Sequence, residues 1–207
     1  MRGKRFQIAC CGLCLAVILS CCVGLTGGAA SSGSVVADRV DPAPAAGAGH
    51  LETIVRAIGP VSREAELRRN IAQATFCLPQ NVVGILYYAL LKLTGNVVDS
   101  EGMNETTIVV TKAPLGVSLG KFIFLNESLL TENTVRHEYG HTLQGYRHGP
   151  FYLLLEGATS LVQAAVSLVV PSFGVAYFDR WPENEANVLG GVVQLAVSAA
   201  ESVSSRR

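Results

Sequence analysis

The pentapeptide HEYGH at residues 137–141 matches the metal-binding pattern HExxH and lies in a segment of helical character. Residues four positions apart lie on the same side of a helix, one turn from each other. The imidazoles of His137 and His141 can therefore bind one tetrahedral Zn²⁺, while Glu138 projects beside the metal and can act as a general base. Gly140 leaves room for another backbone to approach.

The third protein ligand has to come from another part of the chain, and three residues are candidates. His148 lies one position too late for the pattern HExxHxxGxxH, and a shift of one residue turns a helical side chain by about 100°. Glu156 lies in an apolar run beyond a turn, and an antiparallel helical hairpin would bring it level with His141. Glu183 is followed one helical turn later by Asn187, which could hydrogen-bond a ligand histidine from outside the metal's own ligand set.

The sequence around the motif predicts a mainly α-helical fold with a small β-hairpin or sheet, an α+β architecture. Residues 106–111 are rich in β-branched side chains, and residues 116–126 are extended in character with a bend at Gly120. Within this second stretch, residues 121–126 could form an edge strand to which a peptide adds. Residues 94–105 are polar and are predicted to form a loop.

Capping residues and apolar spacing predict helices on both sides of this β region. Ser62 caps an early helix, and Thr131 or Asn133 caps the helix that carries the HEYGH motif. Residues 81–93 are apolar all round, which is typical of a helix that is buried or lies in lipid. A last helix begins at the Trp-Pro pair of residues 181–182.

Residues 151–170 form a second apolar run, which is long enough to cross a bilayer. Glu156 would be costly inside a membrane unless it were paired or bound a cation. Small residues fill much of this run, and they favour a core helix of a small globular domain over a transmembrane helix.

The N-terminal residues 1–25 have the pattern of a membrane-targeting segment, with basic residues ahead of an apolar run over residues 6–25. Three outcomes fit this pattern: attachment of a lipid to Cys21 as in a bacterial lipoprotein, cleavage as an ordinary signal peptide, or retention as a membrane anchor. Residues 26–49 are rich in Gly, Ala, Ser and Pro and are predicted to be a flexible linker. We therefore expect residues 50–207 to form one domain, held at the membrane on its extracytoplasmic side.

Composition narrows the classes of function. The chain has 207 residues, 16 basic and 16 acidic, and this balance argues against a nucleic-acid-binding protein. With 49% hydrophobic residues, most of the chain is predicted to be folded. Five of the six cysteines lie in the leader, so Cys77 has no disulfide partner in the domain and is predicted to be a small buried residue.

The HEYGH motif followed by ENEAN at residues 183–187 resembles the gluzincin type of zincin metallopeptidase. It is most similar to a membrane-linked group in which HExxH is followed by a glutamate in an ExxAD-like motif. The resemblance implies a minimal zincin-like domain in which Glu183 is the third zinc ligand, and this chain has Asn187 where the group has an aspartate. The wider stretch over residues 78–191 also resembles an uncharacterised family of small bacterial membrane or exported proteins, through the segments LPQNVVG, SLGKFIFLN, HEYGHTLQ, GPFYLLLEG and PENEANVLGG.

Together these features predict a membrane-tethered zinc peptidase that hydrolyses peptide or protein substrates through a metal-activated water. Tyr146, His148 and Arg180 are the candidates for stabilising the oxyanion. The alternative is a non-catalytic metal-binding protein, or an integral membrane protein, that retains the HExxH motif.

Overall fold

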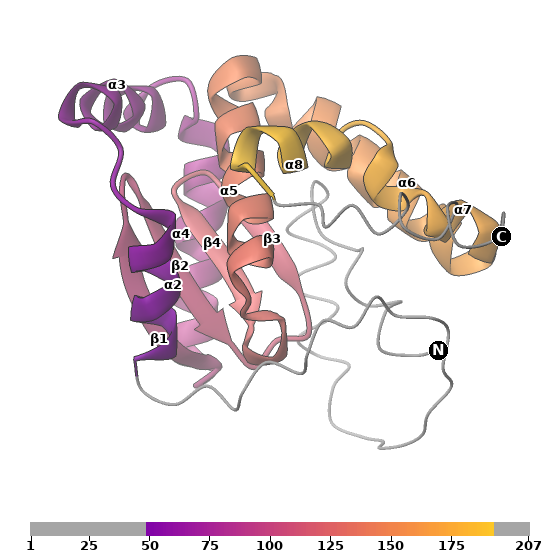
Figure 1. Cartoon of the computed structure of the whole chain (residues 1–207), viewed down its shortest axis with the longest axis horizontal. Helices are drawn as coiled ribbons and strands as arrows, with labels where there is room; N and C mark the ends of the chain where they lie inside the picture. Colours follow the sequence, from indigo (N-terminus) through magenta and orange to yellow (C-terminus); the bar gives the residue numbers. More distant parts are fainter. Residues whose placement is uncertain (1–48, 193–207) are drawn as a thin grey trace, which may run out of the picture.

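Four strands form one mixed sheet at the centre of the computed structural model of the chain, which describes residues 49–192 (Figure 1). The predicted targeting segment 1–25, with Cys21, and nearly all of the predicted linker lie outside the described residues. The sheet order is β1-β2-β4-β3, with β2 and β4 parallel and the two outer pairs antiparallel. The strands are β1 (Val97–Met103), β2 (Thr106–Thr111), β3 (Gly116–Leu119) and β4 (Phe122–Asn126).

Helices make up most of the described chain, so the expected mainly α fold with a small sheet is confirmed. The α-helices are α2 (His50–Ile58), α3 (Arg63–Ala74), α4 (Leu78–Leu93), α5 (Glu132–His148), α6 (Ala158–Val169), α7 (Pro171–Val175) and α8 (Glu183–Gly190). Short 3₁₀ turns are η1 (Glu127–Leu129), η2 (Gly149–Phe151) and η4 (Tyr177–Asp179), and η3 (Leu153–Gly157) is a π-helical turn.

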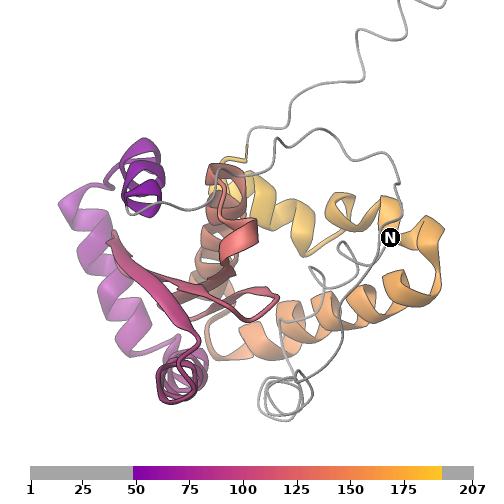
Figure 2. The same cartoon turned by 90° about the horizontal axis from the view of Figure 1, so that it is seen from below.

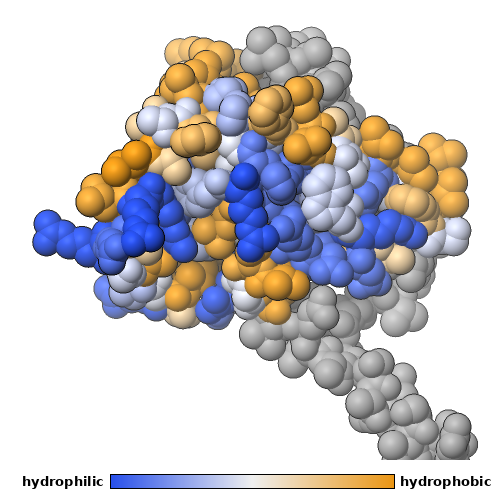
Figure 3. All heavy atoms as spheres, turned by 90° about the horizontal axis from the view of Figure 1, so that it is seen from above, coloured by the Kyte–Doolittle hydropathy of each residue, from blue (hydrophilic) through white to orange (hydrophobic). Residues whose placement is uncertain are grey.

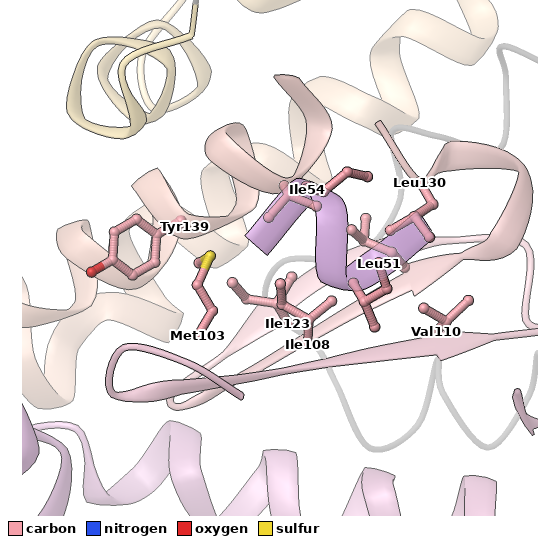
Figure 4. Packing of buried hydrophobic residues seen from close by; sticks show 10 residues of the cluster. Leu51, Ile54, Met103, Ile108, Val110, Ile123, Leu130 and Tyr139 are labelled. Atoms are coloured by element: carbon pink, nitrogen blue, oxygen red, sulfur yellow. The ribbon is translucent and has the colours of Figure 1, made fainter. Parts of the chain in front are cut away.

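The sheet lies between two helical layers, with α2 and α5 on one face and α4 on the other (Figure 2). Alternation along the buried strands creates these two faces, because successive side chains of a strand point in opposite directions. In β4, Phe122 and Phe124 pack toward α4, whereas Ile123 and Leu125 pack toward α2 and α5. Figure 4 shows the second cluster, in which side chains of α2 and α5 meet those of the sheet.

Two expectations about the β region are wrong. Residues 94–105 do not form only a loop, because β1 occupies Val97–Met103 and pairs antiparallel with β2. The polar sequence of β1 gives no apolar alternation from which a strand could be predicted, because β1 is an exposed edge strand in which Met103 alone is buried. Residues 121–126 do not form an edge strand, because β4 lies between β2 and β3, and the edge on that side of the sheet is β3.

Helix α5 begins where the sequence predicts, with the Thr131 side chain accepting a hydrogen bond from the Thr134 backbone N–H. Helix α8 crosses over it at very close range (Figure 1). A Cβ atom added at Gly140 would lie 1.9 Å from the carbonyl oxygen of Ala186, and one added at Gly190 would lie 1.9 Å from that of Arg136. The expectation that Gly140 admits another backbone is therefore confirmed, and α8 is the element that approaches.

The structure also describes Cys77 and the apolar runs that could be membrane helices. Cys77 is buried as predicted, and burial raises the pKa of its thiol to about 11. Within residues 49–192, no single helix is long and apolar enough to cross a membrane. Helices α3 and α4 together have sufficient length and hydropathy, but they are bent by 83° relative to each other. The run over residues 151–170 is divided among η2, η3 and α6.

The crossing of α5 and α8 generates a stability prediction. In an ordinary helix, replacing Gly by Ala stabilises by about 1 kcal/mol. For Gly140→Ala we expect the opposite, a loss of roughly 1–3 kcal/mol or more, because the added methyl group overlaps the Ala186 carbonyl. The measurement is the urea midpoint of unfolding. Gly102→Ala is the control, since a Cβ at Gly102 meets nothing within 4 Å; equal midpoints for the two variants would contradict the packing described.

Candidate metal centre

Three side chains from two helices meet at one point beside the α5–α8 crossing. His137 and His141 extend from α5, and Glu183 extends from the first turn of α8. The two histidine Nε2 atoms are 3.2 Å apart, and Glu183 Oε2 lies 3.1 Å from the first and 3.3 Å from the second. These three residues form a group that could hold a metal ion, as the sequence predicts for all three.

Each histidine is oriented by an amide oxygen on the far side of its ring. His137 Nδ1 lies 2.8 Å from Asn187 Oδ1, and His141 Nδ1 lies 2.8 Å from Gln144 Oε1. Because an amide oxygen can only accept, both Nδ1 atoms carry a proton, and in the neutral form of each imidazole Nε2 then has a free lone pair for a cation. The Gln144 orientation is set independently, since its Nε2 donates to the Pro182 carbonyl at 2.8 Å.

Glu183 is anchored through the oxygen that does not face the histidines. Its Oε1 accepts hydrogen bonds from Ser160 Oγ at 2.6 Å and from Tyr177 Oη at 2.8 Å. Its side chain is 3% exposed, compared with 12% for His137 and 4% for His141. The segment from α6 to η4 thus holds the carboxylate in place and leaves Oε2 directed at the imidazoles.

The electrostatics of this group favour a positive charge at its centre. Burial alone would lower the pKa of His141, but the Glu183 carboxylate, with a contribution from Glu138, raises it to about 9. Burial alone would raise the pKa of Glu183, yet the two histidines hold it well below its ordinary value. Two lone pairs and a carboxylate oxygen that face one another repel unless a proton or a metal cation lies between them.

Glu138 lies beside the three ligand atoms and not among them. Its side chain is directed to β3, where its Oε2 lies 2.9 Å from the Ser118 hydroxyl, which also donates to the Glu138 carbonyl at 2.6 Å. A Cβ added at Gly116 would lie 3.0 Å from Glu138 Oε1, so β3 passes directly alongside this carboxylate. The Glu138 carboxylate is therefore held between α5 and β3.

The other two candidates for the third ligand, His148 and Glu156, are paired with each other. Glu156 lies in the π-helical turn η3 and is fully buried, and its Oε1 forms an ion pair with Nδ1 of His148 at the end of α5. Neither residue belongs to the group around His137. A carboxylate buried in an apolar run needs a polar partner, and for Glu156 that partner is His148.

The residues suggested for stabilising an oxyanion have other roles in the fold. The Tyr146 hydroxyl donates to Glu105 at 3.0 Å in a buried network that joins α5 to the β1–β2 turn. Arg180 donates to the Phe173 carbonyl at 2.7 Å and lies over the ring of that residue. His148 is held by Glu156. The structure therefore does not bring any of the three to the metal group.

Several residues of this centre carry no sequence signal. Gln144, Ser160, Tyr177 and Ser118 act through hydrogen bonds to ligands or to Glu138, and none belongs to a spaced motif. Gln144 could have been suspected, because it lies three positions after His141 on the same face of α5. The partners of Glu183 depend on tertiary contacts between α6, η4 and α8.

No family model matches the chain, and no curated protein or solved structure is significantly similar to it.

The hydrogen bond from His137 to Asn187 generates a prediction about metal affinity. Asn187→Leu removes the acceptor for Nδ1–H, so we expect the affinity for a divalent metal to fall about 10–100-fold. Asn187→Asp keeps an acceptor at the same place and should bind at least as tightly as the parent protein. Competition with a chromogenic chelator measures both. If the Leu and Asp variants bound the metal equally well, the orienting role of this residue would be refuted.

Proposed function

We propose that this protein is a zinc-dependent peptidase tethered to a bacterial membrane by its N-terminal segment. The observation that carries the proposal is the triangle formed by His137, His141 and Glu183. Ligands bound tetrahedrally to Zn²⁺ at about 2.0–2.1 Å lie about 3.3 Å from one another, and the three distances here are 3.1, 3.2 and 3.3 Å. Two imidazole nitrogens and one carboxylate are a donor set typical of catalytic zinc, which keeps a further position open.

Zinc, when bound by these three residues, would activate water and polarise the carbonyl of a peptide bond. Glu138 would take the proton of the attacking water and transfer it to the departing amine. Ser118 supports this role, since its hydroxyl lies 2.9 Å from Glu138 Oε2 and restrains the carboxylate beside the metal group. Asn187 and Gln144 keep the two imidazoles in the tautomer that presents Nε2.

The sheet edge supports a polypeptide as substrate. Within the described residues, β3 pairs only with β4, so its outer backbone groups have no strand partner. An extended peptide could add to this edge by β-pairing, with its side chains alternating between the sheet's two faces. Because Ser118 and Gly116 of β3 lie against Glu138, a peptide on this edge would pass the metal centre. The edge strand that we propose for substrate is thus β3, not residues 121–126.

A second candidate is a non-catalytic metal-binding protein that retains the HExxH motif. Two observations favour it: Asn187 stands where the similar peptidases have an aspartate, and the three candidates for the oxyanion are engaged elsewhere. Hydrolysis of a broad library of fluorogenic peptides by the zinc-loaded chain distinguishes the two. Turnover supports the peptidase, and bound zinc without turnover supports the second candidate.

The metal itself can be tested by stoichiometry. We expect about one zinc per chain in the purified protein, because the triangle offers a single set of ligand atoms. His137→Ala combined with His141→Ala should abolish binding, measured by elemental analysis. His50→Ala is the control, since His50 lies on α2 and contacts the Leu130 carbonyl. Zinc that persisted in the double variant would refute this assignment.

The base is tested by Glu138→Gln, which is nearly isosteric and cannot accept the proton. We expect zinc content to be unchanged and the rate of peptide hydrolysis to fall by about 10²–10⁴-fold. Glu127→Gln, an exposed glutamate in η1, is the matched control and should keep the parent rate. Hydrolysis at the parent rate by Glu138→Gln would rule out the proposed mechanism.

A further inference from the structure

Helix α4 is apolar on both of its sides, and the fold covers only one of them. Its inner side packs on the sheet, where Gly84 allows contact with Leu119 and Phe122 and where Tyr87 and Leu91 are buried. Its outer side has no covering element among residues 49–192. The large residues exposed there recur at helical spacing and are Leu78 (53%), Val82 (47%), Ile85 (51%), Leu86 (52%) and Leu93 (86%).

The outer side of α4 continues into a second apolar segment at its N-terminal end. Gly149, at the start of η2, lies against Phe76, and its carbonyl accepts a hydrogen bond from Gln80 of α4 at 3.1 Å. The adjoining turns expose Phe151 (62%), Leu154 (71%) and Leu155 (46%). We call the exposed apolar residues of 76–93 and 151–155 together the α4 face. Figure 3 shows apolar residues along the margin that lies behind the sheet in Figure 1, with hydrophilic residues across the middle.

Two lysines and one aspartate lie at the margin of the α4 face, where Lys92 and the exposed Asp99 line the same surface hollow. Residues 76–93 contain a single charged side chain, Lys92, which lies over the ring of Tyr88. Lys121 lies over Phe122, whose ring stacks on Tyr88. The only acidic residue of 149–157 is the buried Glu156. An apolar surface with two lysines against its aromatic rings suits a bilayer with anionic headgroups, because lysine can extend its amine to the headgroup level.

The geometry also determines how α4 can meet a membrane. Its 16 residues span about 24 Å, less than the hydrocarbon core of about 30 Å, and its inner side is committed to the sheet. It can therefore lie in the plane of the interface but cannot cross the bilayer.

We propose that the α4 face docks on the surface of a lipid bilayer and forms a second membrane contact besides the N-terminal segment. The inference rests on the membrane tether of the proposed function and is independent of the peptidase chemistry. The predicted linker of residues 26–49 has an r.m.s. span of roughly 25–30 Å, so the leader keeps the domain within about its own width of the bilayer. At that distance, the exposed apolar side chains of the α4 face would gain free energy from contact with lipid.

Docking would hold the metal centre at the membrane surface. The segment η2–η3, part of the α4 face, follows directly on α5, which carries His137 and His141. It leads into α6, whose Ser160 holds the Glu183 carboxylate. The docked face and the ligands are therefore joined by one continuous stretch of chain, and the substrates in reach are polypeptide segments close to the bilayer.

The test uses the single tryptophan of the chain, Trp181. In the full-length Trp181→Phe protein, Leu86→Trp places a reporter on the α4 face, and Val188→Trp places one on the exposed side of α8, on the opposite side of the sheet (Figures 1 and 2). Each protein is reconstituted in vesicles of phosphatidylglycerol and phosphatidylcholine, with plain or brominated acyl chains. We expect brominated lipid to quench the reporter at position 86 and not the one at 188.

A charged variant provides a second measurement that does not depend on one reporter. Val82→Glu with Ile85→Glu, added to the Leu86→Trp protein, should abolish the quenching, while the far-ultraviolet circular dichroism stays unchanged because both positions are about half exposed. Quenching that persists in this variant would overturn the proposal.

The other occupants of the α4 face give different results, and each would overturn docking. If the reporter is not quenched and its emission moves to shorter wavelengths as the protein concentration rises, a second copy of the chain covers the face. If its emission lies at short wavelength at every protein concentration, with or without vesicles, a segment of the same chain covers the face. Protein that floats with the vesicles but shows no quenching at position 86 overturns docking alone, and protein that does not float overturns the tether as well. Zinc content and peptide hydrolysis, measured separately, remain a test of the peptidase.

Discussion

The close crossing of α5 and α8 is the constraint on which the candidate metal centre depends. Two glycines, one in each helix, let the backbones touch: Gly140 lies against the Ala186 carbonyl, and Gly190 lies against that of Arg136. At this distance the first turn of α8 places Glu183 within 3.3 Å of both imidazoles. A separation larger by one methyl group would move the carboxylate out of reach of a shared cation, since metal–ligand distances tolerate only about 0.2 Å.

The histidines, the glutamate and their hydrogen-bond partners form an arrangement that favours a positive charge at its centre. Asn187 and Gln144 fix the tautomers, and Ser160 and Tyr177 fix the carboxylate, so the three ligand atoms cannot turn away from one another. Such preorganisation has a folding cost, because burying acceptors that face each other is unfavourable without a cation. Proteins retain strain of this kind where a ligand relieves it.

The sequence predicts those parts of the fold and site that depend on local spacing. The two histidines one turn apart, the Thr131 cap and the bend at Gly120 all follow from the geometry of a single element. A strand exposed at the sheet edge needs no apolar alternation, so the polar sequence of β1 does not predict a strand. The order β1-β2-β4-β3 and the hydrogen bonds that hold Glu183 arise from contacts far apart in the chain, for which no periodic pattern exists. Glu183 is predicted from two features, Asn187 one turn away and the resemblance of ENEAN to an ExxAD-like motif.

The side chain at position 187 orients a histidine without adding a charge to the buried group. A divalent cation held here would be bound by one carboxylate, Glu183, and two imidazoles. Asn187 accepts the hydrogen bond from His137 without adding a second carboxylate to the ligand group. Gln144 does the same for His141, so both imidazoles are oriented by amides and not by carboxylates. Amide acceptors raise the basicity of the imidazoles less than carboxylates do, so a cation held here would keep more of its positive charge than one bound by histidines oriented by carboxylates.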